Sequence, residues 1–240
     1  MRGDCLRGLG DELRKQRPDR FEASGERQGK GVRAILRSLG RALVLSAAVA
    51  SVVSLAAAPA LAATTWTVKP GGAVTAKAGT TTVNDTTAGL TVTCTSSTIK
   101  GTLKSGSGLA GKAIGTFTSL AFNSCSTSGV TLSVTLTGKM PLNATKYNST
   151  TKTANMTITG IKGTLSVPSV GCSATIAGTT ATSGGTVHAK FSNKTDTLKV
   201  LTTGSTLHLY NDTCPVTANN DLVNFTGAYK FAPKTTITSP

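Results

Sequence analysis

From Ala63 to Pro240 the sequence contains no glutamate, arginine or glutamine, and its only acidic residues are four aspartates. Because these three missing residues are strong helix formers, their absence argues against a helical fold. The only two histidines lie in the same stretch, so few groups remain there for acid–base catalysis. Aromatic residues make up 4% of the whole chain, which leaves few flat surfaces for stacking sugars or bases.

The first 62 residues have a different composition and are expected to direct export. They carry eleven lysines and arginines and six acidic residues, all before position 42, and an apolar core covers about residues 42–58. Small residues follow at Ala60 and Ala62, as a signal peptidase requires. The sequence therefore predicts an N-terminal extension and signal peptide over residues 1–62, with cleavage between Ala62 and Ala63.

Two alternatives for this leader stay open. The apolar run is long enough to cross a bilayer of about 30 Å as an uncleaved anchor, but its serines and Pro59 argue against a stable transmembrane helix. Translation from Met1 gives an unusually long charged region, whereas translation from Val32 would leave a compact leader. Residues 1–31 alternate acids and bases without an apolar period, which favours the start at Val32.

Four cysteines follow the leader, at Cys94, Cys125, Cys172 and Cys214. An even number of cysteines in an exported chain predicts two disulfides. Of the three possible pairings, Cys94 with Cys125 and Cys172 with Cys214 is favoured, because each bridge then closes a segment within one half of the domain. No Cys-x-x-Cys motif occurs, so no metal site is expected.

Threonine occurs 43 times after the leader, and its branched side chain fits a pleated strand. Apolar residues alternate with threonine and serine in residues 90–94 and 130–136, which is the period of a half-buried strand. This periodicity argues against a disordered, mucin-like stalk. Further strands are expected at residues 65–69, 97–103, 113–122, 154–167, 172–178, 186–191, 197–203, 205–211 and 222–231.

Strands this short and frequent, without helical crossovers, pair antiparallel. We therefore expect residues 63–240 to form a single all-β domain, an antiparallel two-sheet sandwich stapled by disulfides, with a closed β-barrel as the alternative. The pentapeptide of residues 99–103 recurs at residues 161–165, which hints at a duplicated half.

The titratable residues predict no catalytic site. His188 and His208 each lie between apolar neighbours in an expected strand, so alternation points both imidazoles toward solvent. Asp212 and Asp221 are the aspartates closest together in sequence, and both are typical turn residues. Residues 106–111 have the glycine spacing of a dinucleotide-binding loop, but no helix follows them, so a surface loop and no cofactor are expected.

Fourteen lysines and four aspartates give the part after the leader a formal charge of 14 minus 4, or +10. The lysines are scattered along the sequence, so a solvated surface is the simplest interpretation. Attraction to anionic cell-wall polymers is the functional interpretation. Nucleic acid is not an expected partner, because arginine forks, a recognition helix and an aromatic-basic strand motif are all missing. Trp66 is more typical of core or strand-edge packing than of a carbohydrate platform.

The segments TWTVKPGG, GTLKSGSGL and LKVLTTGSTLHLYN, with the terminal TITSP, resemble secreted proteins of actinobacteria. The resemblance covers the chain from Trp66 to Pro240, and its more specific parts are LKVLTTGSTLHLYN and TITSP. Those secreted proteins have no assigned activity. The resemblance therefore implies export and a Gram-positive wall environment, and it implies no catalytic residue.

Together these features favour a non-catalytic secreted or cell-wall-associated β domain that acts as a structural or binding module. A membrane-active or pore-like β protein is the first alternative. It requires apolar residues that face outward, which residues 90–94 and 130–137 could supply. A hydrolase is the second alternative, and it would require His188, His208 and an aspartate in one cleft.

Overall fold

The computed structural model describes residues 64–240. The predicted leader, its cleavage site at Ala60, Ala62 and Ala63, and both start positions lie outside the described residues. The described elements, in chain order, are β1 (Thr65–Lys69), β2 (Gly72–Ala78), β3 (Thr81–Asp85), β4 (Leu90–Leu103), β5 (Gly106–Ala110), β6 (Gly115–Thr127), β7 (Val130–Asn148), β8 (Thr153–Val167), the 3-10 turn η1 (Pro168–Val170), β9 (Cys172–Ala177), β10 (Gly185–Ser192), β11 (Thr197–Val200), β12 (Leu207–Tyr210), β13 (Leu222–Ala232) and β14 (Thr236–Thr238).

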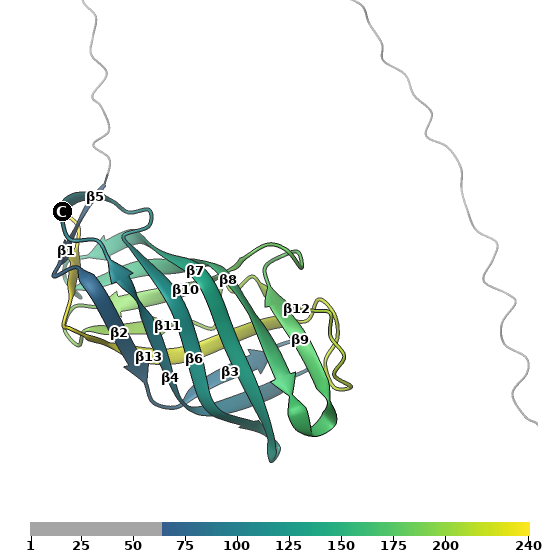
Figure 1. Cartoon of the computed structure of the whole chain (residues 1–240). Coiled ribbons are helices and arrows are strands. Elements are labelled where there is room, and N and C mark those ends of the chain that lie inside the picture. The colour runs from purple at the N-terminus through teal and green to yellow at the C-terminus, as the bar shows by residue number, and fades with distance from the viewer. Residues whose placement is uncertain (1–63) are drawn as a thin grey trace, which may run out of the picture. The chain divides into compact units, whose positions relative to one another are not determined.

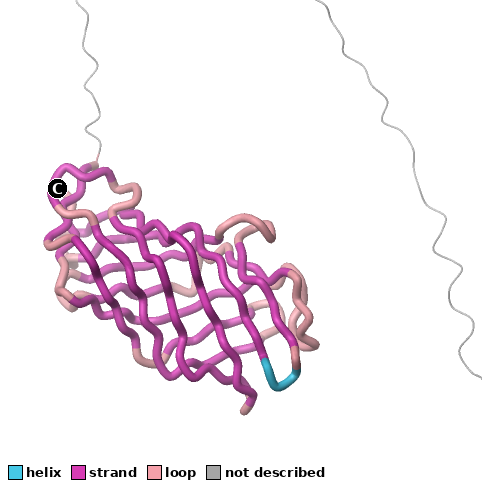
Figure 2. The backbone as a smooth tube through the Cα atoms, in the orientation of Figure 1, coloured by secondary structure: helices cyan, strands magenta, loops and turns pink. Residues whose placement is uncertain are grey.

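The expected all-β antiparallel fold is confirmed, and every strand pair in the described residues is antiparallel. Only η1 interrupts the strands and loops, and Figure 2 shows it as a short helical turn. Among residues 64–240, no helix is both long and apolar enough to cross a membrane.

Five long strands, β4, β6, β7, β8 and β13, run through the large sheet, and three of them, β4, β8 and β13, change partners along their length. One end of β4 pairs with β3 and the other with β2, and β13 pairs with the same two strands. In the same way β8 pairs with β10 over its first part and with β9 over its second part. The large sheet therefore has two halves, one containing β2, β10 and β11 and the other containing β3, β9 and β12.

The long strands lie in two packed layers, with β4, β6 and β7 in front of β11 and β13 in Figure 1. Strand pairs β8–β10 and β2–β13 join the layers at their two edges. Rings from the two layers meet between them: the ring centroids of Phe117 and Phe231 are 6.2 Å apart, and those of Phe122 and Phe225 are 5.8 Å apart. This arrangement encloses one apolar core between the layers.

A separate sheet of three strands, in the order β14–β1–β5, joins the two ends of the described chain. Trp66 on β1 is 2% exposed, so its expected place in the core is confirmed. The prediction of a surface loop at residues 106–111 is wrong, because residues 106–110 form β5 and pair with β1. Leu109, opposite Trp66, is half-buried against the core, and this contact stabilises a strand that two glycines would otherwise disfavour.

The repeated pentapeptide lies in β4 and in β8, and its two glycines meet the same constraint. A Cβ atom at Gly101 would collide with the carbonyl oxygen of Thr116, and one at Gly163 would collide with that of Thr135. Both clashes involve the neighbouring strand's backbone, so the repeat marks two places where long strands approach closely.

Candidate binding surface

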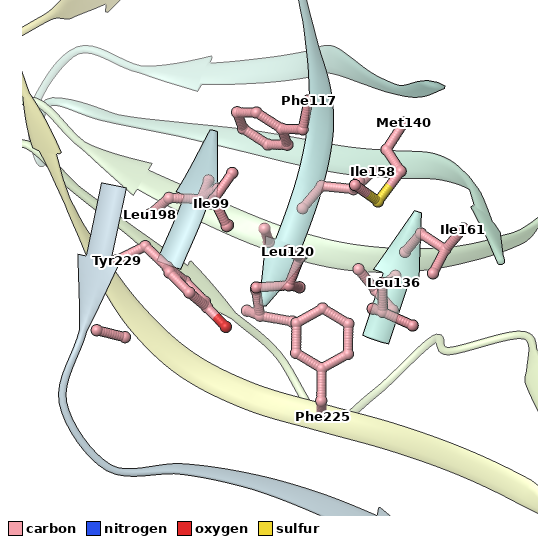
Figure 3. Close-up of a cluster of buried hydrophobic side chains, with 14 of the residues drawn as sticks. Ile99, Phe117, Leu120, Leu136, Met140, Ile158, Ile161, Leu198, Phe225 and Tyr229 are labelled. Carbon is pink, nitrogen blue, oxygen red and sulfur yellow. The ribbon is translucent and has the colours of Figure 1, made fainter. Parts of the chain in front are cut away.

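Apolar side chains from both layers fill the interior of the sandwich. Figure 3 shows Ile99, Phe117, Leu120, Leu136 and Tyr229 converging between the layers. The buried hydroxyl of Tyr229 accepts a hydrogen bond from Ser97 Oγ at 2.9 Å. Burial raises the pKa of Tyr229, and the hydrogen bond from Ser97 lowers it by a smaller amount. Contacts with other molecules must therefore be sought on the outer faces of the strands.

All fourteen lysines of residues 64–240 are exposed. They lie on the strand segments and turns of the half that contains β2, β10 and β11, on β1, or at the boundary between the halves. We call this half the lysine half. The fourteen residues are Lys69, Lys77, Lys100, Lys104, Lys112, Lys139, Lys146, Lys152, Lys162, Lys190, Lys194, Lys199, Lys230 and Lys234. Residues that are scattered in the sequence are therefore gathered in space.

Four of these lysines lie on neighbouring strands and form a row across the lysine half. Lys77 on β2 is directly opposite Lys230 on β13, and Lys190 on β10 is directly opposite Lys199 on β11. Lys230 and Lys199 are diagonal neighbours, because Lys199 pairs with Ala228, two residues before Lys230. Like charges directly opposite each other destabilise a sheet. We call these four residues the lysine row.

A hollow of about 490 Å³ adjoins the lysine row on the outer face of β11 and β13. Lys199 and the small residue Ala228 line it, together with the hydroxyl-bearing residues Thr202, Thr203 and Thr226. The hollow therefore places hydroxyl groups beside a lysine ammonium group.

The other half contains β3, β9 and β12 and carries no lysine in the segments described. Both predicted disulfides are confirmed there: Cys94–Cys125 joins β4 to β6, and Cys172–Cys214 joins β9 to the loop before β13. We call this half the disulfide half. On its outer face Ser133, Ser166 and Ser173 form one cross-strand line, and the exposed apolar side chains of Val170, Val216 and Leu222 also lie in this half.

Two of the four aspartates are buried together in the disulfide half. Asp85 ends β3 and is 5% exposed, and Asp221 precedes β13 and is 6% exposed. Asp85 Oδ1 accepts hydrogen bonds from the backbone N–H groups of Thr87 and Ala88, at 2.9 and 2.8 Å. Asp221 Oδ2 accepts one from the backbone N–H of Ala218 at 2.7 Å.

The two carboxyl groups interact, and their interaction favours a bound proton. Burial raises the pKa of Asp85, the backbone hydrogen bonds from Ala88 and Thr87 lower it, and the negative charge of Asp221 raises it further. No lysine contributes to this shift. Asp85 Oδ2 is buried and has no hydrogen-bond partner among the described residues.

The two histidines differ in their exposure to solvent. His188 is exposed on β10, whereas His208 on β12 is half-buried and its Nδ1 has no hydrogen-bond partner. The solvent-facing prediction therefore holds for His188 and only in part for His208. Among residues 64–240, no group of three or more His, Cys, Asp or Glu side chains is placed to hold a metal ion.

The turn roles predicted for two aspartates are confirmed. Asp212 Oδ1 accepts a hydrogen bond from the backbone N–H of Cys214 at 2.8 Å, and Asp221 bonds within its own loop as described above. Sequence reasoning missed that Asp221 also meets Asp85, because the two residues are far apart in the chain. The pairing of β3 with β13, which brings them together, had no sequence signal.

The apolar residues that the membrane-active alternative requires on the outside face inward. Val92, Leu132, Val134 and Leu136 are all buried in the core. Threonines and serines occupy the outward positions between them.

Neither a scan against protein-family models nor searches of curated proteins and of solved structures finds a match to this chain.

Proposed function

We propose that the protein is a non-catalytic secreted or cell-wall-associated β domain that acts as a binding or structural module through its outer surface. The observation that carries this proposal is the division of the chain's charge. All fourteen lysines are exposed and none lies in the disulfide half, while apolar side chains fill the space between the layers. Such a surface attracts anionic partners over a distance set by the Debye length.

The two disulfides support the exported location in this proposal. Disulfides persist in oxidising compartments, outside the cytosol. The leader composition and the resemblance to secreted actinobacterial proteins point to the same location, and a Gram-positive wall is rich in anionic polymers. The protein would thus meet a surface of opposite charge immediately after export.

Co-sedimentation of the oxidised protein with isolated actinobacterial cell walls, at low and at high salt, tests the proposal. We expect the protein to pellet at low salt. Pelleting that persists at high salt would indicate a specific wall ligand, whereas pelleting lost with salt would indicate attraction by lysine charge. Protein that stays in the supernatant at both salt concentrations would contradict wall association.

A further inference from the structure

We propose that the lysine row, with the hollow beside it, binds a linear phosphodiester-linked polymer of the cell envelope whose chain lies across the strands. This inference rests on the proposed wall association and names the partner and the contact surface. The row consists of Lys77, Lys230, Lys199 and Lys190, on four neighbouring strands.

The spacing of the row fits a polymer with separated charges. Residues directly opposite on antiparallel strands have Cβ atoms about 5 Å apart, and diagonal neighbours are about 7 to 8 Å apart. Lys100 extends the row at one end, diagonal to Lys77, because Thr98 pairs with Lys77 and Lys100 lies two residues further along β4. Charges at this interval can pair with successive phosphates of a phosphodiester-linked chain.

The electrostatics of the row favour an anion. Within each directly opposed pair, the two lysines repel each other. The residues that face the row from adjacent strands, Thr98, Asn155 and Thr197, are uncharged. Asp196, in the turn between β10 and β11, is the one aspartate of the lysine half. A bound phosphate between two opposed ammonium groups would replace their repulsion with attraction.

The neighbouring side chains favour a polyol phosphate over a nucleic acid. Lysine acts as a point charge and does not require the planar, bidentate geometry that arginine offers. The hollow is lined by the exposed Thr202 and Thr203, whose hydroxyls can hydrogen bond to the hydroxyls of a repeating unit. The hydroxyl of the third threonine, Thr226, hydrogen bonds to that of Thr82 at 2.7 Å. Binding of single-stranded nucleic acid relies on aromatic stacking, and two of the chain's four Trp and Tyr residues, Trp66 and Tyr229, are buried in the core.

The test uses two variants with the same change in net charge. The row variant carries Lys77→Gln, Lys190→Gln, Lys199→Gln and Lys230→Gln. The control variant carries Lys104→Gln, Lys112→Gln, Lys139→Gln and Lys234→Gln, which are equally exposed and lie outside the row. Thermal unfolding of both variants confirms that they are folded before binding is measured.

Binding to lipid-free poly(glycerol phosphate) is measured by titration calorimetry at several salt concentrations. We expect the row variant to lose more than about tenfold in affinity at low salt. The slope of the logarithm of its binding constant against the logarithm of the salt concentration should become shallower by about one unit for each lysine that contacts a phosphate. The control variant should lose less than about threefold. Equal losses in both variants would overturn the proposal, because they would show attraction by net charge alone.

Two further probes test the class of polymer. Tighter binding to oligo(dT) of equal charge would assign the row to nucleic acid, and equal binding to hyaluronate would remove the preference for phosphodiesters; either result overturns the proposal. Cell walls from which acid has extracted the phosphodiester polymers distinguish the proposed wall association from the proposed polymer partner. Wild-type protein that still pellets with stripped walls would leave wall association intact while contradicting this partner.

Discussion

The lysine half and the disulfide half share the same five long strands but differ in charge, crosslinking and surface chemistry. The lysine half carries the exposed cations and no disulfide, whereas the disulfide half carries both bridges and three of the four aspartates. In the lysine half, cohesion comes from packing, including Phe191 and Phe231, whose ring centroids are 5.3 Å apart. In the disulfide half, covalent bonds add to the packing.

This difference separates the surface suited to binding from the region that is covalently stabilised. Repulsion between opposed lysines destabilises the lysine half. Its strands continue into the disulfide half, where both bridges crosslink the same sheet. The irregular segment from Asn211 to Asp221, the longest loop described between two strands, lies in the disulfide half, where the bridge from Cys172 to Cys214 anchors it. The comparison therefore predicts that stability and binding respond to different substitutions.

The largest effect is expected from removing the disulfides. The bridges join residues separated by 31 and 42 positions, so the chain-entropy relation gives each a contribution of about 3 to 4 kcal/mol. Replacing either pair, Cys94→Ala with Cys125→Ala or Cys172→Ala with Cys214→Ala, should lower the free energy of unfolding by that amount in guanidinium titrations.

Binding to the anionic polymer provides the control for these variants. Because no bridge lies in the lysine half, folded protein that lacks one disulfide should keep its polymer affinity within about twofold, well below the roughly tenfold that 1.4 kcal/mol represents. A disulfide variant that stays folded but loses binding would show that the two halves are not separate in function.

The second effect concerns the buried carboxyl pair and depends on pH. Because the folded-state pKa of Asp85 is raised above the usual value of 3.8, the folded state binds the proton more tightly than the unfolded state does. The stability from this group is present at acidic pH and is lost as pH rises through the raised pKa. Asp85→Asn should therefore increase stability at neutral pH and remove this part of the pH dependence.

Urea unfolding from pH 3 to pH 7 measures this effect, with Asp196→Asn in the lysine half as the matched control. Asparagine can keep the carbonyl oxygen that accepts the turn hydrogen bonds of Thr87 and Ala88. If Asp85→Asn and wild type show parallel pH profiles, the carboxyl pair does not hold an extra proton in the folded state.

Much of the fold could be predicted from the sequence because alternation is a local signal. The strand expected at residues 154–167 matches β8 within one residue, and that at residues 222–231 matches β13 equally well. Strands with a weak alternation were missed, among them β2, β3 and the second part of β7. In β7, Gly138 and Pro141 interrupt the pattern, and the register of its pairing with β6 shifts there.

The candidate surface could not be predicted, because it depends on which distant strands become neighbours. Lys77 and Lys230 are far apart in the chain, and only the pairing of β2 with β13 places them opposite each other. The same holds for Asp85 and Asp221. By contrast, the disulfide pairing was predictable, because each bridge closes a segment within one half of the sequence.

The smallest effect is expected in the lysine half, where relieving a like-charge pair should stabilise the fold. Lys77→Thr and Lys230→Thr, alone and together, form a double-mutant cycle. Directly opposed like charges cost about 0.2 to 1 kcal/mol, so either single substitution should raise the free energy of unfolding by a few tenths of a kcal/mol at low salt. The second substitution should add less, because the repulsion is already gone.

Salt distinguishes this repulsion from a change in strand propensity. At about 1 M salt the Debye length is about 3 Å, shorter than the separation of the two ammonium groups, so the coupling between Lys77 and Lys230 should vanish while any gain from threonine's strand propensity remains. Lys104→Thr, in a loop outside the row, serves as the control. Strictly additive single substitutions at low salt would contradict the repulsion, and the row would then have no unfavourable charge for a polyanion to relieve.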